Sequence, residues 1–301
     1  MPLLIFKIYN PSQFTIKVSY LQGEWRENAL VFLKKGTSYG RMIRKENEGR
    51  ERRVNRASQS GRFAGLDTMR GITLLSMIAY HASWDLVYLY GVNWPWYRSF
   101  GAYLWQQSIC WTFILLSGYC LHLGRHRLKR GLAAFGGGVV VSLVTVVAMP
   151  DSPVICGVLT LLGSATLLSI PLEPLLRRIP ARAGLAGCFL LFMLLRDVNA
   201  GYLGFEGARI LALPDGWYRN LLTTWLGFPH PGFVSSDYFP LLPWLFLFLT
   251  GYFFYDLRSG EPSELKLPVV TAMGRHSLLI YLLHQPVIYG VLTVLHWLGM
   301  L

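Results

Sequence analysis

Apolar runs of about 20 residues recur from residue 61 to the end of the chain, and they restrict the fold more than any other feature. Charged residues make up only 15% of the 301 residues, whereas a soluble domain carries about 25%. A run of this length can cross the hydrocarbon core of a bilayer as a helix. Because lipid cannot hydrogen-bond a peptide group, such segments satisfy their own backbone as α-helices. The sequence therefore predicts an all-α, polytopic membrane helix bundle.

We expect about seven spans, separated by short segments that contain Pro, Gly or clustered charge. Their ranges are about 69–90, 102–122, 131–149, 153–171, 183–196, 238–256 and 276–298. Together they form one transmembrane domain over residues 61–301. Residues 1–60 differ, because they end in a polar, basic stretch, and we expect an N-terminal extension that is disordered or lies on the membrane surface. Met42 opens that basic stretch, so a start of translation at Met42 is a further hypothesis.

Lys and Arg concentrate in alternate loops, which indicates the orientation of the bundle. Basic segments precede the first span and follow the second, fourth and sixth, whereas the loops over residues 91–101 and 150–152 hold only Arg98. Because cytoplasmic loops carry the excess of Lys and Arg, the pattern predicts a cytoplasmic N-terminus and an outer C-terminus in a multi-pass protein of the plasma membrane. The long segment 197–237 then lies outside, and we expect a short interfacial helix at residues 217–228.

The net charge of +12 comes largely from these loops, so we interpret it as contact with an anionic membrane face rather than with nucleic acid. The four cysteines all fall inside predicted spans, at Cys110, Cys120, Cys156 and Cys188. Their spacing matches neither a metal site nor a disulfide framework, so we expect them to act as small packing residues. The sequence predicts no bound metal.

The first span carries ionisable side chains that lipid cannot solvate, so they are candidates for a functional site. Arg70 and His81 differ by about 20° around a helix and by about 16 Å along it, so they share a face with Asp67, Trp84 and Asp85. A carboxylate one turn away can orient an imidazole and raise its basicity. We predict His81 as a general base, Asp85 as its orienting group, and Arg70 as a donor ligand or a partner of Asp67. A structural histidine, hydrogen-bonded within the bundle, is the alternative.

The sixth and seventh spans add further candidates for substrate binding. Asp237 precedes the sixth span and either caps that helix or lines an outer mouth. Tyr281 and His284 share a face of the seventh span, where Pro286 is expected to kink the helix and free a carbonyl. Packing within the bundle is the alternative role for both side chains. Asp67 and Trp84 join this group of substrate-binding candidates from the first span.

Four stretches resemble a known family. They are LDTMRGITLLSMIAYHASWDL, FILLSGYCL, SSDYFPLLPWLFLFLTGY and MGRHSLLIYLLHQPVI. In combination they look like the bacterial membrane proteins related to the catalytic domain of heparan-α-glucosaminide N-acetyltransferase, over about residues 62–294. The spacing of Arg70 and His81 is also similar to that of the broader transmembrane acyltransferases of surface glycans. The chain departs from the family at Thr160, where the pattern Gly-Ile-Leu-His usually ends in histidine.

The resemblance implies an enzyme that moves an acyl group, in most cases acetyl, from cytoplasmic acyl-CoA to a sugar across the membrane, with His81 at the site. A CoA donor needs cations for its phosphates. Besides Arg70, the candidates near the predicted inner face are Arg125, Arg127, Arg275 and His276. An extracytoplasmic glycan or sugar acceptor could stack on the aromatic residues Trp94, Trp96, Tyr97, Trp217 and Tyr218, which could equally form an ordinary interfacial belt.

Two other function classes fit part of the pattern. A proton-coupled transporter or permease also uses intramembrane His and Asp side chains, and the Pro286 kink is a transporter feature. The two halves of the sequence show no evident repeat, which argues against this class. A seven-helix receptor or structural membrane partner would not need so many polar groups on one face of its first span.

Overall fold

The computed structural model describes residues 64–124, 126–258 and 267–301. The predicted extension over residues 1–60, its boundary with the membrane domain and the candidate Arg125 lie outside the described residues.

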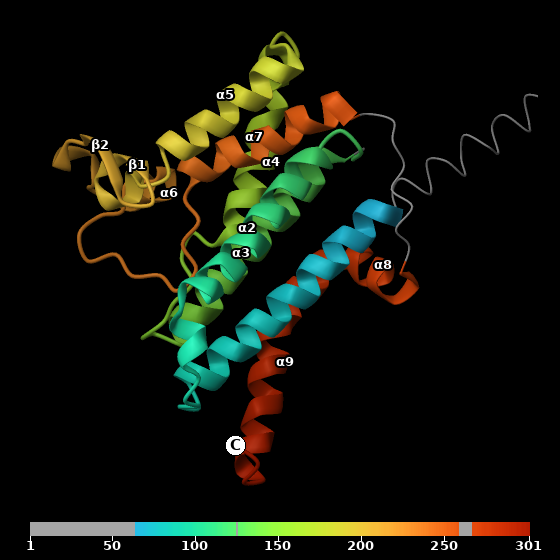
Figure 1. The fold of residues 1–301 in the computed structure, drawn as a ribbon, viewed down its shortest axis with the longest axis vertical. Coiled ribbons are helices and arrows are strands. Elements are labelled where there is room, and N and C mark those ends of the chain that lie inside the picture. Colours follow the sequence, from blue (N-terminus) through green and yellow to red (C-terminus); the bar gives the residue numbers. More distant parts are fainter. Residues whose placement is uncertain (1–63, 125, 259–266) are drawn as a thin grey trace, which may run out of the picture. The chain divides into compact units, whose positions relative to one another are not determined.

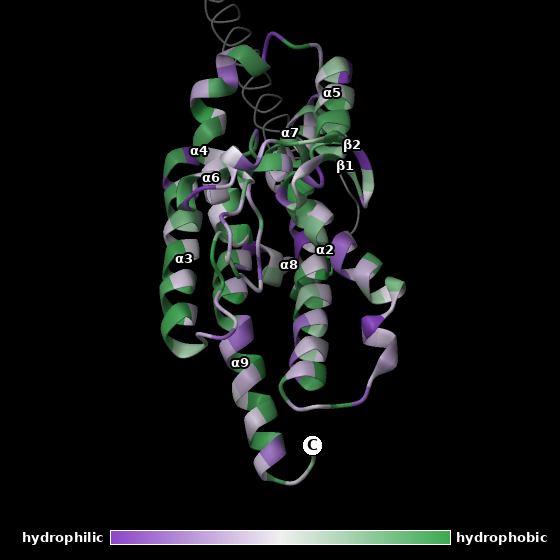
Figure 2. Cartoon of the chain, turned by 90° about the vertical axis from the view of Figure 1, so that its left-hand side faces the viewer, coloured by the Kyte–Doolittle hydropathy of each residue, from purple (hydrophilic) through white to green (hydrophobic). Residues whose placement is uncertain are grey.

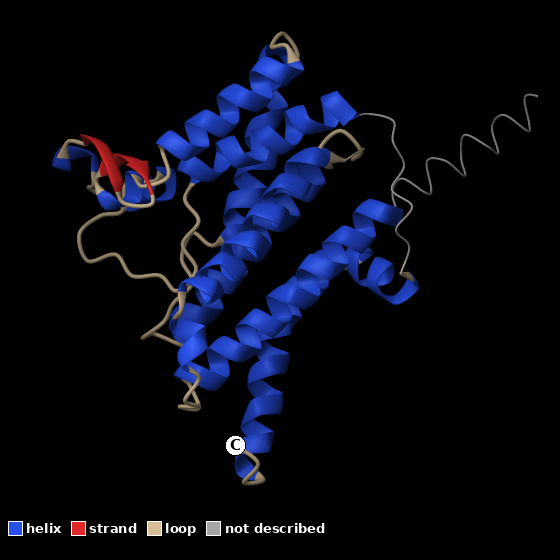
Figure 3. Ribbon diagram, in the orientation of Figure 1, coloured by secondary structure: helices blue, strands red, loops and turns tan. Residues whose placement is uncertain are grey.

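Helices dominate the described part of the chain (Figures 1 and 3). The first described helix covers residues 64–88, and we call it the 64–88 helix. The longer helices that follow are α2 (Phe100–Tyr119), α3 (Arg127–Ala148), α4 (Val158–Leu176), α5 (Ala181–Leu194), α7 (Leu241–Arg258) and α9 (Ser277–Trp297). The shorter elements are η1 (Pro95–Arg98), η2 (Val198–Ala200), β1 (Tyr202–Phe205), β2 (Ala208–Ala212), η3 (Asp215–Trp217), α6 (Leu221–Leu226) and α8 (Pro268–Arg275).

Each of the seven predicted spans overlaps one of the longer helices, so the positions of the helices agree with the apolar pattern. Within the described residues, α3, α4 and α9 are long and apolar enough to cross a membrane, and α5 and α7 are shorter apolar helices. Figure 2 shows that most residues along α3 are hydrophobic. These helices mark the chain as a membrane protein, whereas the count of seven spans and the cytoplasmic N-terminus stay predictions.

The main apolar core lies where α2, α4, α5 and α7 meet. Ile114, Leu161, Phe192 and Phe248 from these four helices are each almost completely buried. Within this group, α7 packs extensively against both α5 and α2. Helix α3 lies outside the group and packs along α4. Helix pairs in a membrane approach closely through small residues rather than through a hydrophobic driving force.

Two glycines show this close approach between α2 and α7. A Cβ atom added to Gly118 of α2 would collide with the carbonyl oxygen of Phe248. A Cβ atom added to Gly251 of α7 would collide with the carbonyl oxygen of Leu115. The two backbones therefore lie in direct contact over one helical turn of each helix.

The 64–88 helix and α9 run in the same direction, side by side. Successive contacts join His81 to His284, Asp85 to Gln285 and Tyr90 to Thr293, so both helices advance together along the chain. Leu74 and Met77 of the 64–88 helix pack with Ile280 and Tyr281 of α9 in a second small core. The first and last long helices thereby bring distant parts of the sequence together.

A small β-hairpin lies in the segment between α5 and α7 and was not predicted from the sequence (Figure 3). Its strands β1 and β2 pair antiparallel, and the connecting residues Glu206 and Gly207 both have positive φ, at 48° and 91°. That combination is typical of a two-residue hairpin turn, in which glycine takes the second place without strain. The helix predicted within residues 217–228 is present in shorter form as α6, which Asn220 and Thr223 cap reciprocally, and its place at the membrane interface stays a prediction.

Candidate active site

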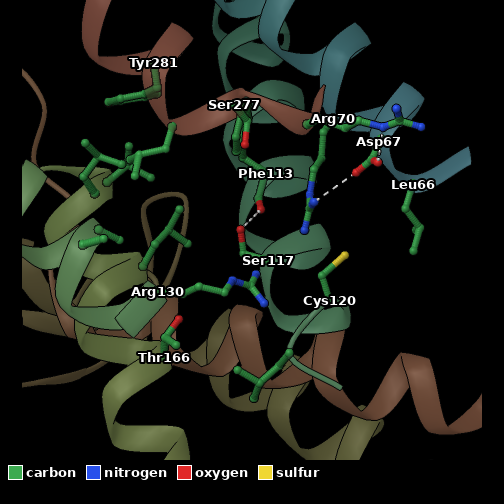
Figure 4. A pocket seen from close by; sticks show the side chains of 18 of the residues that line it. Leu66, Asp67, Arg70, Phe113, Ser117, Cys120, Arg130, Thr166, Ser277 and Tyr281 are labelled. Carbon is green, nitrogen blue, oxygen red and sulfur yellow. Dashed lines mark hydrogen bonds and ion pairs between the residues drawn. The ribbon is translucent and has the colours of Figure 1, made fainter. Parts of the chain in front are cut away.

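A cavity of about 410 Å³ opens between the start of the 64–88 helix, the end of α2, the first turns of α3 and the start of α9. Side chains from α4 close its remaining wall. In the predicted topology, all of the helix ends that frame this cavity lie toward the cytoplasmic face. Figure 4 shows the cavity with its polar side chains, and we call it the first cavity below.

Arginines dominate the charge of the first cavity. Arg70, Arg130 and Arg275 line it, together with a single described carboxylate, that of Asp67. The Asp67 oxygens lie 3.3 Å from Nη1 of Arg70 and 3.4 Å from Nε of Arg275. The side chains of Arg70 and Arg130 extend toward one another beside Ser117 and Cys120 in Figure 4. Three guanidinium groups and one carboxylate in the lining leave positive charge available, which suits phosphate oxygens.

The cationic residues predicted for a CoA donor have different places in the structure. Arg275 lines the first cavity, whereas His276 is exposed at the start of α9. Arg127 turns to Glu173, with its Nη1 2.8 Å from the carboxylate, and its Nε donates to the Leu121 carbonyl at 3.0 Å. Arg130 is not among the residues predicted from the sequence. It lies three residues after Arg127, so the two side chains are neighbours on the surface of α3, and this spacing could have identified it.

His81 lies deeper in the bundle and faces His284 of α9, with 5.0 Å between ring centroids. His284 in turn contacts the ring of Tyr281, one turn earlier on the same helix, at 5.3 Å. Nδ1 of His284 hydrogen-bonds the Tyr281 carbonyl oxygen. Because a carbonyl can only accept, Nδ1 carries the proton, which leaves Nε2 of a neutral His284 as an acceptor. The structure thus brings together the two histidines that the sequence analysis proposed separately.

Asp85 is completely buried, and Gln285 holds it. Nε2 of Gln285 donates to both carboxylate oxygens, at 2.8 Å and 3.0 Å. The sequence analysis assigned this carboxylate to His81 and missed Gln285, which directly follows His284. The Asp85–Gln285 bond therefore fixes α9 against the 64–88 helix beside the histidine pair. Trp84, a predicted substrate ligand, packs against Tyr88 with ring centroids 5.2 Å apart.

A second, smaller cavity of about 140 Å³ lies on the other side of the α4 N-terminus. Its polar lining comes from α2, from the segment after α5 and from the loop before α7, with Gln106, Gln107, Arg196, Asn199 and Asp237. Nη2 of Arg196 donates to Gln107 at 3.1 Å, and its guanidinium lies 4.8 Å from the Trp244 ring centroid. Arg196 is not among the residues predicted from the sequence, because its partners Gln107 and Trp244 come from distant segments.

Asp237 acts at the start of α4 rather than as a cap of the helix that follows it. Its Oδ2 accepts a hydrogen bond of 3.3 Å from the backbone N–H of Val158, the first residue of α4. Its carboxylate also interacts with the hydroxyl of Tyr281 on α9. Burial raises the pKa of this carboxyl to about 6, against the opposing effect of the Val158 and Tyr281 contacts.

The aromatic residues proposed for sugar stacking divide into buried and exposed members. Tyr97 is buried, and its hydroxyl donates to the Tyr80 carbonyl at 3.1 Å. Trp94, Trp96 and Trp217 expose a large part of their surface, which fits stacking and an interfacial belt equally well. The hydroxyl of Tyr218 donates to the Val198 carbonyl. Within the described ranges, no three His, Cys, Asp or Glu side chains are arranged to hold a metal ion.

A family profile, described as "Heparan-alpha-glucosaminide N-acetyltransferase, catalytic", matches residues 62–286. The match covers most of the 301 residues and includes the 64–88 helix, both cavities and the histidine pair. No curated protein and no solved structure matches the chain.

Proposed function

Since the chain belongs to the family of heparan-α-glucosaminide N-acetyltransferase catalytic domains, we propose that it is a membrane acyltransferase that uses cytoplasmic acetyl-CoA. Its acceptor is a hydroxyl or amino group of an extracytoplasmic sugar or glycan. The observation that carries this proposal is the arginine-rich first cavity, which lies at the helix ends assigned to the cytoplasm and leads along α9 to the histidine pair.

The first cavity supplies what the phosphate end of a CoA donor requires. Arg70 and Arg130 project into it, and Arg275 stands at its rim with 60% of its side chain exposed. Charge-assisted hydrogen bonds from guanidinium groups to phosphate are among the strong polar contacts in proteins. The apolar side chains Phe113, Leu159 and Leu162 line the interior, where the uncharged arm of the donor would lie. The thioester would then point toward Tyr281 and the histidines.

In the direct mechanism His81 acts as the general base. Its imidazole removes the proton from the acceptor hydroxyl or amine as the acceptor attacks the thioester carbonyl. The carbon–sulfur bond breaks, CoA leaves as the thiolate and takes up a proton, and the acetyl group stays on the acceptor. In the two-step alternative, an imidazole nitrogen first takes the acetyl group and then gives it to the acceptor. Asp85 contributes by holding Gln285, and through it the His284 segment, in place.

The parallel pairing of the 64–88 helix with α9 supports the proposed topology. Spans one and seven of an odd-numbered bundle run in the same direction through the membrane, as these two helices do. The alternation of Lys and Arg between loops leads independently to the same orientation.

The test is acetyl transfer by the full chain in proteoliposomes, with radiolabelled acetyl-CoA inside and a panel of hexosamines and neutral sugars outside. We expect labelled sugar with the native protein and none with His81→Ala. His296→Ala, which removes a histidine near the other end of α9, is the matched control and should retain transfer. Normal transfer by His81→Ala would contradict the assignment.

Two further readouts separate the remaining alternatives. Label that stays on the protein when acetyl-CoA is supplied without acceptor identifies the two-step route, and its absence identifies direct transfer. The histidine pair also suits a proton relay, so the same vesicles are tested for uptake of unmodified sugar. Uptake without covalent transfer would replace the enzyme by a transporter.

A further inference from the structure

The linings of the two cavities come together at Asp237, Val158 and Tyr281. Tyr281 lines the first cavity, Asp237 lines the second, and the Tyr281 hydroxyl interacts with the Asp237 carboxylate. Val158 also lines the first cavity, and its backbone N–H donates to Asp237. A path from one cavity to the other therefore leads past the Tyr281–Asp237 pair.

We propose that Tyr281 and Asp237 form a gate between the donor cavity and the acceptor cavity, which excludes bulk water from the thioester until an acceptor displaces the contact. This inference rests on the proposed function for the names of the two cavities. It adds a role for two residues that determine whether the acetyl group goes to a sugar or to water.

The start of α4 is shaped to hold Asp237 in this position. A Cβ atom added to Gly157 would lie 2.8 Å from Oδ2 of Asp237 and 2.9 Å from Cγ1 of Val154, so a larger residue would push the carboxylate away. A carboxylate at the first N–H groups of a 19-residue helix is also favoured by the helix dipole. Asp237 is thereby fixed on α4, and opening the gate requires a movement of the Tyr281 side chain.

The second cavity has the chemistry of an acceptor subsite on the far side of this gate. Its volume of about 140 Å³ and its amide, guanidinium and carboxylate groups suit a small hydrogen-bonding part of a polyhydroxylated ligand. A hydroxyl group of the acceptor that bonds to Asp237 would compete with the Tyr281 hydroxyl for the same oxygens. Acceptor binding and gate opening are then one event, which keeps the thioester dry in the absence of acceptor.

The first experiment measures access between the cavities without using activity. Ser117→Cys places a thiol on the wall of the first cavity, in a protein whose four native cysteines are replaced by alanine. The protein is reconstituted in one orientation, and a charged, membrane-impermeant methanethiosulfonate is added on the side of the second cavity. We expect slow labelling with Tyr281 and labelling about tenfold faster with Tyr281→Ala, because a contact to a charged group contributes about 1.5 kcal/mol or more.

Two further variants keep this experiment decisive. Tyr281→Phe retains the ring and loses the hydroxyl, so it should also label faster than the native gate if the contact to Asp237 closes the path. Leu279→Ala is a matched control from the exposed face of α9 and should label at the native rate. Equal labelling rates in native protein, Tyr281→Phe and Tyr281→Ala would overturn the gate.

The second experiment measures acetyl-CoA hydrolysis in the absence of any sugar. Hydrolysis breaks the carbon–sulfur bond with water as the nucleophile and releases acetate and CoA. We expect Tyr281→Phe to raise the ratio of hydrolysis to transfer severalfold, whereas Leu279→Ala leaves that ratio unchanged. An unchanged ratio in Tyr281→Phe contradicts the gate. If the native protein transfers no acetyl group to any sugar, the proposed function fails, while thiol labelling still decides whether the gate exists.

Discussion

At the scale of single residues, Asp85 is expected to position the proposed site without touching the reacting atoms. Its carboxylate is fully buried, and Gln285 binds both oxygens from the opposite helix. A buried charge that loses a strong donor is costly, so this bond constrains the relative position of the two helices. His81 lies one turn before Asp85, and His284 directly precedes Gln285. The Asp85–Gln285 bond therefore sets the separation of the two histidine rings.

We therefore predict that Gln285→Leu destabilises the protein by about 1–3 kcal/mol, because it leaves the Asp85 charge unpaired. The kcat for acetyl transfer should fall by a larger factor than the KM for acetyl-CoA changes, since the substitution does not alter the lining of the donor cavity. Asp85→Leu combined with Gln285→Leu should restore part of the stability, which a double-mutant cycle from thermal unfolding in detergent measures. Additive effects of the two changes would contradict the coupling.

Asp237 leads to a prediction about pH. Its folded-state pKa of about 6 lies above the ordinary value of 3.8, so the folded protein binds this proton more tightly than the unfolded chain does. Stability should therefore fall as pH rises from about 4 to 6, and the loss should be complete above that window. The titratable groups that interact with this carboxyl include Tyr281 of α9 and Cys110 of α2. In Asp237→Asn the slope of melting temperature against pH should flatten over this window, and an unchanged slope would contradict the assignment.

Among the elements, α2 and α7 approach each other closely in the main core, with their backbones in contact at Gly118 and Gly251. Gly118→Val should destabilise the protein by about 3 kcal/mol or more, because the added atoms meet the Phe248 carbonyl rather than a flexible side chain. Gly136→Val in α3 is the matched control, since a Cβ atom there meets nothing within 4 Å. Thermal unfolding in one detergent checks both, and equal losses would refute the close approach.

The apolar periodicity predicts where the long helices lie, because a membrane span must be apolar throughout its length. The β1–β2 hairpin was not predicted because its strands have only four and five residues, too few for a clear periodic pattern. Its register depends on the turn at Glu206 and Gly207. Side-chain partners escaped for another reason. Spacing along one helix suggested His81 as the partner of Asp85. In the structure Asp85 is hydrogen-bonded to Gln285, which lies 200 residues away in the sequence. The hydrogen bond between Arg196 and Gln107 in the second cavity could not be predicted for the same reason, because the two residues are 89 positions apart.

At the scale of the whole molecule, the orientation of the chain is the property that most needs a direct measurement. We expect a cytoplasmic N-terminus and an outer C-terminus. Alkaline phosphatase, which folds only outside the cytoplasm, should be active when fused after Leu301, and a fluorescent protein in the same place should be dark. The reverse pattern would place the arginine-rich cavity outside and remove its access to cytoplasmic acetyl-CoA.

The parallel pairing of the first and last long helices has a consequence for biosynthesis. Membrane segments are inserted from the N-terminus as the ribosome makes them, so the 64–88 helix waits for α9 while about 200 further residues are added. With the 64–88 helix inserted as the predicted first span, Asp85 and His81 would face the bilayer interior during that interval without their partners from α9. A nascent chain that stops before α9 would then hold an exposed polar stripe, which quality-control proteases and chaperones can recognise. We therefore expect the synthesis of α9 to complete the proposed site and to end the period in which the cell can reject the protein.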